Sequence, residues 1–322
     1  MNNYENIPQI DLSPLWDGGD NGLKKVADEV RKAYTTVGFS YLINYNISRE
    51  VLEETYAAAK EFLTLPLEKK LEIKQNKAFR GYVPLDKPDP SGQKKINQLE
   101  AFVMTHEILE DHPEYHGGMY LAGPNQWPKN MAGFKKAVIS YRDHLLVLSE
   151  RLVTVFSIAL GLGKTGLDKF FINPTYVLRL QYYPEQPKEI SSNVFGLAPH
   201  TDYGLFTILS QQSVDGLEVK NDKGEWLNVP YKPNTLILNS GDILKRWSNN
   251  TFKSALHRVV NRTKNERYSI PFFFEPNMHS IIEVLQNYQS KGFPPKYRPI
   301  KYGDYLLSRL QNDFGALESL GY

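Results

Sequence analysis

The sequence predicts an α+β fold, in which a mostly helical region at residues 1–170 is followed by a β-rich region at residues 171–322. Apolar residues recur at helical spacing in the first region, whereas short apolar runs separated by turn residues fill the second. Many short strands at such spacing are typical of a sandwich or a barrel, and a jelly roll is one of the candidates. The sequence shows no repeat, low-complexity tract or linker, so the two regions are expected to form a single domain over residues 1–322.

Four helices are expected from the apolar spacing and from the residues that begin or end helices. The first follows Asn21 as its N-cap, and the second begins after Ser48. A long helix runs from about Met131 to Leu160, and its polar interruptions indicate a core helix rather than a membrane span. The last helix covers residues 303–311.

Strands are expected from alternating polarity and from the turn residues between the runs. The helical region contains two of them, at residues 37–45 and 99–105, with long loops elsewhere between residues 79 and 127. The strands expected in the β-rich region cover residues 175–183, 205–211, 216–220, 225–229, 235–238, 254–260 and 268–275.

Composition and charge exclude several classes of function. Lys plus Arg number 38 and Asp plus Glu number 36, so no concentrated basic face points to a nucleic-acid partner. The absence of cysteine excludes disulfides, thiolate haem, iron–sulfur clusters and cysteine nucleophiles. Residues 1–8 carry no apolar signal core, so the chain is expected to be cytoplasmic with no membrane partner. Nothing in the sequence predicts an oligomeric state.

The central pattern of the sequence is His200-Thr201-Asp202, followed at a distance by His257. Residues two apart on a strand point to the same face, so His200 and Asp202 can direct an imidazole and a carboxylate at one metal ion. Two histidines and one carboxylate leave three positions of an octahedron open, which suits iron(II) that binds a cosubstrate and oxygen. A closed zinc site would need four protein ligands, often cysteines. His-x-Asp alone could instead be a turn with a capping aspartate.

A second pattern, Arg267-Tyr268-Ser269, follows the distal histidine. Its Arg and Ser are again two apart, so a guanidinium fork and a hydroxyl can face one carboxylate. Arg179, Gln181 and Tyr183 also share one face of an otherwise apolar strand, which suggests a lined cavity where Tyr183 could donate to a bound acid. The alternative for Arg267 is a surface ion pair, and the alternative for Arg179, Gln181 and Tyr183 is an ordinary half-exposed strand.

Together these segments resemble the isopenicillin N synthase-like branch of the 2-oxoglutarate/iron(II)-dependent dioxygenases. The resemblance covers nearly the whole chain, including the N-terminal Ile7–Leu12 and the pair Gly38-Phe39. Its most specific motifs are Ala198–Leu205, Asn239–Asn249, Ser254–Val260 and Glu266–Phe274.

The resemblance implies a double-stranded β-helix (jelly-roll) core with flanking N-terminal helices and a long supporting helix. It implies His200, Asp202 and His257 as iron(II) ligands, and Arg267, Ser269 and Tyr183 as the clamp on the distal carboxylate of 2-oxoglutarate. The implied reaction uses O2 to oxidise an unactivated C–H bond of a small molecule by hydroxylation, desaturation or ring closure, with succinate and CO2 as co-products. Many plant members have Asn where Gln181 stands, so the role of Gln181 stays open.

The substrate pocket is less well defined by the resemblance. In the family, the pocket is usually shaped by the part of the chain that here contains Arg80, Tyr82, Asn97 and Phe102. Further candidates are Phe195, Trp247 and Phe273, and each of the seven residues could equally be structural. An Arg80 in the pocket would favour an acidic or amino-acid-like substrate.

Two other functions remain compatible with the sequence. An iron(II) oxidase of the isopenicillin N synthase type would use the Arg-x-Ser pair to hold the substrate's own carboxylate, without 2-oxoglutarate. A non-catalytic jelly-roll binding protein would keep the scaffold alone, but it would need neither the triad nor the clamp.

Overall fold

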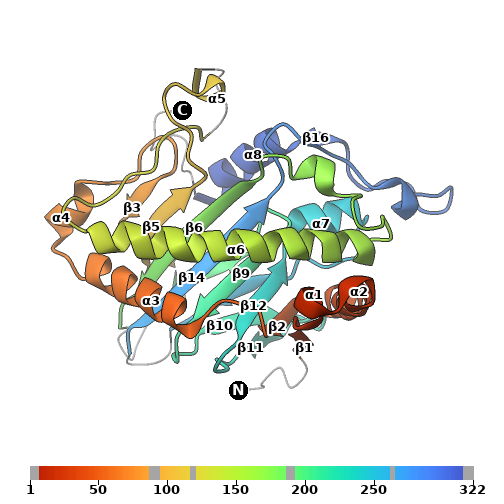
Figure 1. Cartoon of the computed structure of the whole chain (residues 1–322), viewed down its shortest axis with the longest axis horizontal. Helices are drawn as coiled ribbons and strands as arrows, with labels where there is room; N and C mark the ends of the chain where they lie inside the picture. Colours follow the sequence, from red (N-terminus) through yellow and green to blue (C-terminus); the bar gives the residue numbers. More distant parts are fainter. Residues whose placement is uncertain (1–6, 87–94, 117–120, 186–192, 262–264, 315–322) are drawn as a thin grey trace.

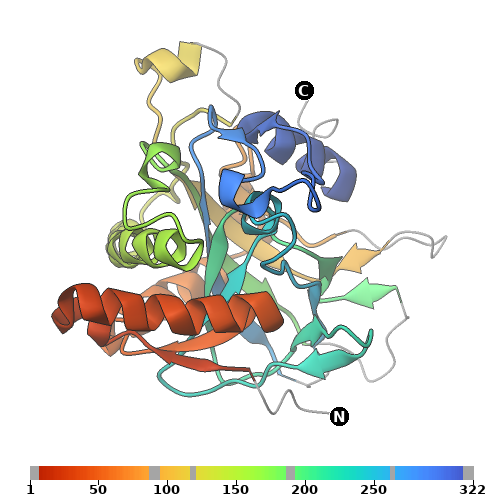
Figure 2. The same cartoon turned by 90° about the vertical axis from the view of Figure 1, so that its right-hand side faces the viewer.

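Two facing β-sheets with helices on the outer face of the larger one make up the computed structural model (Figure 1 and Figure 2). The structure describes residues 7–86, 95–116, 121–185, 193–261 and 265–314. The arrangement is the expected jelly roll: antiparallel strands form a flattened barrel, and its interior lies between the two sheets.

The larger sheet contains eight strands in the order β1-β2-β12-β9-β14-β6-β5-β3. Strands β1 and β2 pair in parallel, whereas the other neighbours in this sheet are antiparallel. The strands are β1 (Gln9–Asp11), β2 (Phe39–Ile43), β12 (Leu236–Ser240), β9 (Phe206–Gln211), β14 (Arg267–Glu275), β6 (Thr175–Tyr183), β5 (Glu100–Thr105) and β3 (Gly81–Val83).

The smaller sheet has four strands in the order β11-β10-β13-β8, and two short strand pairs lie beside the barrel. The four strands are β11 (Trp226–Asn228), β10 (Leu217–Lys220), β13 (His257–Val259) and β8 (Leu197–His200). The pairs are β4 (Ile96–Asn97) with β7 (Val194–Phe195), and β15 (Ile281–Ile282) with β16 (Ile300–Lys301).

Three long helices, α2 (Gly19–Thr36), α3 (Arg49–Leu63) and α6 (Ala132–Ala159), cover one face of the larger sheet, and α6 crosses its strands (Figure 1). As expected, Ser48 caps α3 by accepting from the main-chain N–H of Val51. The expected cap at Asn21 is wrong, because α2 begins at Gly19. The remaining helices are α1 (Pro14–Asp17), α4 (Leu67–Leu71), α5 (Pro113–His116), η1 (Asp168–Phe170), α7 (Asp242–Trp247), η2 (Gln286–Tyr288) and α8 (Tyr302–Phe314).

The alternation along β6 shows how the two sides of the larger sheet are used. Leu178 and Leu180 point outward into the core beneath the helices, whereas Tyr183 points inward to the core between the sheets. A polar side chain on the inner face therefore lies in a dry space, where it must be paired or must await a ligand. Within the described ranges, no helix has the length and apolar character that crossing a membrane requires.

Candidate active site

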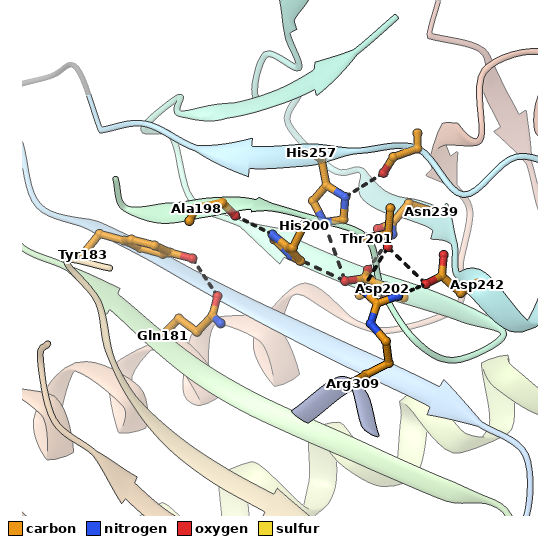
Figure 3. Close-up of polar contacts among 12 residues, drawn as sticks. Gln181, Tyr183, Ala198, His200, Thr201, Asp202, Asn239, Asp242, His257 and Arg309 are labelled. Atoms are coloured by element: carbon orange, nitrogen blue, oxygen red, sulfur yellow. Dashed lines mark hydrogen bonds and ion pairs between the residues drawn. The ribbon is translucent and has the colours of Figure 1, made fainter. Parts of the chain in front are cut away.

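His200, Asp202 and His257 lie together, and their potential ligand atoms are all within 4.8 Å of one another (Figure 3). His200 ends β8 and is paired across the ladder with His257 in β13. Oδ1 of Asp202 is 3.6 Å from Nε2 of each histidine. Asp202 was expected on the same strand as His200, but β8 ends at His200, so the loop that follows the strand turns the carboxylate toward the imidazoles.

Main-chain carbonyls orient both imidazoles. Nδ1 of His200 is 2.8 Å from the carbonyl oxygen of Ala198, and Nδ1 of His257 is 3.0 Å from that of Ala255. A carbonyl can only accept, so each Nδ1 carries the proton and each Nε2 presents its lone pair toward Asp202.

Asp202 is held by its second carboxylate oxygen. Its Oδ2 accepts from the Thr207 hydroxyl at 2.5 Å and from the Asn239 amide at 2.6 Å, which leaves Oδ1 facing the imidazoles (Figure 3). Asn239 lies within one of the motifs that carry the resemblance, but no pattern in the sequence pairs either residue with Asp202.

The charge states of the cluster suit a divalent metal. Burial, reinforced by the neighbouring His257, lowers the pKa of His200 to about 4, so this imidazole is neutral at pH 7. Burial alone would raise the pKa of Asp202, but His257, His200 and the bonds from Thr207 and Asn239 outweigh it and lower that pKa. A neutral imidazole and an ionised carboxylate are the forms that bind metals. Two nitrogens and one oxygen, with no fourth protein ligand in the described chain, fit iron(II) with open positions.

A second polar group lies on the inner face of β6 and β14. Arg267 pairs across the ladder with Tyr183, and Ser269 pairs with Gln181, so the four side chains share one wall of the barrel. All four are buried, and all four line the same cavity as the His-Asp-His cluster. The shared strand face expected for Gln181 and Tyr183 is therefore confirmed.

Arg267 carries an unsatisfied donor in this wall. Its Nη2 donates to the Gln211 side chain at 3.1 Å and its Nε donates to the Val214 carbonyl at 3.3 Å. Its Nη1 is buried and has no hydrogen-bond partner among the residues that the structure describes. Because an unpaired buried cation donor is costly, this atom marks a place for an anion.

The contacts of Gln181 address the question that the sequence left open. Its Oε1 accepts from the Tyr183 hydroxyl at 2.8 Å and from the Ser269 hydroxyl at 3.1 Å. One amide oxygen thus gathers both hydroxyls beside Arg267. Rotating the two O–H bonds would present them, together with Nη1, to one carboxylate.

The seven residues suggested for the substrate pocket separate into two groups. Arg80, Tyr82, Phe102 and Trp247 are almost fully buried in the protein interior and are absent from the cavity wall. The Arg80 guanidinium donates to the main-chain carbonyls of Ala78, Leu121 and His106, so it fixes loops instead of facing a ligand. Tyr82 donates to Glu100, Phe102 packs on Phe134, and Trp247 packs on Phe170.

The other three candidates are half-buried and closer to the cluster. Phe273 lines the cavity. Asn97 and Phe195 form the short pairing of β4 with β7, and Oδ1 of Asn97 accepts from the main chain of Ala198, next to the strand end that carries His200. Apolar residues that the sequence did not single out complete the wall: Phe39, Leu197, Leu209, Leu217, Val259 and Pro271.

Comparisons with known proteins agree with this geometry. Residues 174–276 match the 2OG-Fe(II) oxygenase superfamily, and residues 7–130 match the N-terminal region described as non-haem dioxygenase in morphine synthesis. The 2-oxoglutarate-Fe(II) type oxidoreductase hxnY of Emericella nidulans is 33% identical over 97% of this chain and 91% of its own. Homoarginine-6-hydroxylase 2-ODD-C23.1 of Arabidopsis thaliana is 32% identical over 97% of this chain and 98% of its own.

A solved structure shows the same fold with ligands. The crystal structure of a full-length Neurospora crassa protein in complex with alpha-KG and thymine is similar with a TM-score of 0.84 and 31% identity, covering 96% of this chain and 97% of that one. The chain therefore belongs to the 2-oxoglutarate- and iron(II)-dependent oxygenases, the enzymes that use iron(II), 2-oxoglutarate and O2.

Proposed function

We propose that His200, Asp202 and His257 hold the iron(II) ion and that Arg267, Ser269 and Tyr183 hold the distal carboxylate of 2-oxoglutarate. The observation that carries this assignment is that Arg267, which lines the same cavity as the His-Asp-His cluster, has a buried Nη1 without a partner among the described residues. Residues 1–322 would then act as one catalytic domain that oxidises a C–H bond of a small molecule, with succinate and CO2 as co-products. Iron, when bound, supplies the oxidative chemistry.

The protein's own contribution is to position ligands and to exclude water. Arg267 offers a charged donor that is already desolvated, so an incoming carboxylate gains a strong hydrogen bond without displacing bulk water. The hydroxyls of Tyr183 and Ser269 add two further donors, held in place by Gln181. Leu209 and Leu217 line the same cavity and keep it apolar around these donors.

The relatives support a small molecule as the substrate. One relative is named for hydroxylation of homoarginine, and another was crystallised with thymine. Both compounds are small and polar. We therefore propose that this chain acts on a small organic substrate and has no nucleic-acid partner. The oxidation would end in hydroxylation, desaturation or ring closure.

The proposal is tested by turnover of iron-loaded protein with and without 2-oxoglutarate. Oxygen consumption and succinate release are measured for the wild type and for His257→Ala. We expect slow succinate release that requires 2-oxoglutarate and falls to background in the variant, because one of only three metal ligands is lost. Oxygen consumption that does not require 2-oxoglutarate would instead favour the isopenicillin N synthase type of oxidase.

A further inference from the structure

A second cavity lies outside the proposed active site. It has a volume of about 290 Å³ and is bounded by the end of α2, the turn after β10, α7 with the residues that follow it, and the segment that leads into β13. None of the residues that line it lines the cavity of the His-Asp-His cluster. A ligand in this cavity would therefore be distinct from the ligands of the active site.

Positive charge predominates on the wall of this cavity. Three lysines line it, Lys220, Lys245 and Lys253, against one carboxylate, that of Asp222. Nζ of Lys253 is 2.5 Å from Oδ2 of Asp222, but 83% of the aspartate side chain is exposed, so this ion pair holds the lysine only weakly. The ammonium of Lys245 makes no ion pair or hydrogen bond with the described part of the chain. The ammonium groups of Lys245 and Lys253 are thus available to an anion.

The helix ends beside the cavity do not cancel this charge. α2 ends at Thr36, which lines the cavity, and the C-terminus of a helix carries a partial negative charge on its unpaired carbonyls. The carbonyl of Tyr34 accepts from the main-chain N–H of Lys253 at 2.9 Å. In α7, the carbonyl of Lys245 accepts from the main-chain N–H of Asn250 at 2.9 Å. Because these carbonyls are paired, the negative charge at the two helix ends is reduced and the lysines dominate the local field.

The hydroxyl of Ser254 is a further polar group at this cavity. Ser254 lines the cavity, and its Oγ is buried without a hydrogen-bond partner among the described residues. A buried polar group without a partner is costly, so this hydroxyl favours a ligand that carries oxygen acceptors. Ammonium groups act as point charges and suit a phosphate, whereas the planar fork of an arginine suits a carboxylate, and the described lining contains no arginine.

The cavity adjoins a proposed metal ligand through the main chain. Ser254, Ala255 and Leu256 line the cavity and directly precede His257, and the Ala255 carbonyl is 3.0 Å from Nδ1 of this imidazole. The Leu256 carbonyl accepts from the main-chain N–H of Lys220, another lining residue, at 2.8 Å. An occupant would thus contact the segment that orients His257.

We propose that this cavity binds the phosphate group of a small organic phosphate ester. The proposal goes beyond the function proposed above and does not depend on it. The phosphate would lie among the ammonium groups and the Ser254 hydroxyl. A cavity of this size has room for more than a phosphate, so the organic part would lie against Val37 and Leu256, two half-buried apolar residues of the wall.

Calorimetric titration of the full-length, metal-free protein with phenyl phosphate tests the proposal, and phenol and inorganic phosphate are titrated in parallel. We expect one phenyl phosphate per chain, weaker binding of inorganic phosphate because it lacks the organic part, and no binding of phenol. Lys245→Gln and Lys253→Gln should each weaken phenyl phosphate by about ten-fold, since each removes a charged donor. Lys253→Arg keeps the charge and should keep most of the affinity.

Two further variants locate the binding. Lys223→Gln removes the same charge from the exposed turn between β10 and β11, where it does not line the cavity, and Arg267→Met removes the arginine of the clamp. Both should bind phenyl phosphate as tightly as the wild type.

Four outcomes would overturn the proposal. An equal loss in Lys223→Gln would show that surface charge alone attracts the probe, and a loss in Arg267→Met would place the phosphate in the clamp. Inorganic phosphate that binds as tightly as the ester would contradict a site for an organic phosphate. So would absent binding, or an affinity that stays unchanged in both Lys245→Gln and Lys253→Gln.

Discussion

The unpaired polar atoms of the barrel interior carry most of the functional argument at the scale of single residues. Nη1 of Arg267 and Nε of Arg179 are buried donors without acceptors, and they lie at the two ends of one wall. Between them, Gln181 gathers the hydroxyls of Tyr183 and Ser269. Buried donors of this kind suit ligands that carry oxygen acceptors.

Glu275, the last residue of β14, predicts a pH dependence of stability. Burial raises its pKa to about 7, opposed by the neighbouring Tyr302 hydroxyl and reinforced by the charge of Asp202. In the unfolded chain the pKa is about 4.5. Between these values the folded state binds more protons than the unfolded state, so the contribution of Glu275 to stability falls as pH rises through this window.

Glu275→Gln tests this directly in metal-free protein, because the amide cannot ionise. Between about pH 5 and pH 8 the thermal midpoint of the wild type should fall more steeply than that of the variant. The stability of the variant relative to the wild type is therefore expected to be greatest near pH 8. Parallel curves for the two proteins would show that folding does not raise the pKa of Glu275.

At the scale of elements, α7 and α8 brace the loop that carries Asp202. The main-chain N–H of Asp242, at the start of α7, donates to the carbonyl of Asp202 at 2.8 Å. Oδ2 of Asp242 accepts from the Thr201 hydroxyl at 3.1 Å and from Nη1 of Arg309 at 2.5 Å (Figure 3). It also accepts from the Tyr305 hydroxyl at 2.8 Å. The C-terminal helix is thereby linked to the residue between two proposed metal ligands.

Loss of this brace should weaken metal binding without removing a ligand. Arg309→Met is expected to lower iron(II) affinity by about ten-fold, in the range seen when partners of metal ligands are removed. Anaerobic titration with iron(II) measures this, and Arg298→Met, an exposed arginine shortly before the same helix in the chain, is the control. Equal affinities in the two variants would mean that α8 does not position the loop.

Local sequence patterns predicted some elements better than others. Alternating polarity placed β6 at residues 175–183, and helical spacing placed α6 within a residue of its observed ends. The strand expected at residues 254–260 is confined to His257–Val259. The short helix α7 was missed because it begins at Asp242, within the run Ser240-Gly241-Asp242 that is also typical of a turn.

At the scale of the whole molecule, the jelly roll brings His200, Asp202 and His257 from separate segments to one point. The motifs predicted that these three side chains gather and that Arg267, Ser269 and Tyr183 share one wall, because each pattern depends on residues two apart near a strand. They could not predict which side chains of the first region reach the cavity. Phe102 packs in the core under the helices and Arg80 donates to loop carbonyls, an outcome set by how β3, β5 and α3 pack, which no local pattern encodes.

The most direct test of the site is anaerobic calorimetric titration of the protein with 2-oxoglutarate, with and without iron(II), in the wild type and in Arg267→Met. We expect one 2-oxoglutarate per chain in the presence of iron, much weaker binding without it, and a loss of at least about ten-fold in Arg267→Met, since a hydrogen bond to a charged group is removed. Binding that needs neither iron nor Arg267, or no binding to the iron-loaded wild type, would contradict the assignment of the cluster and the clamp.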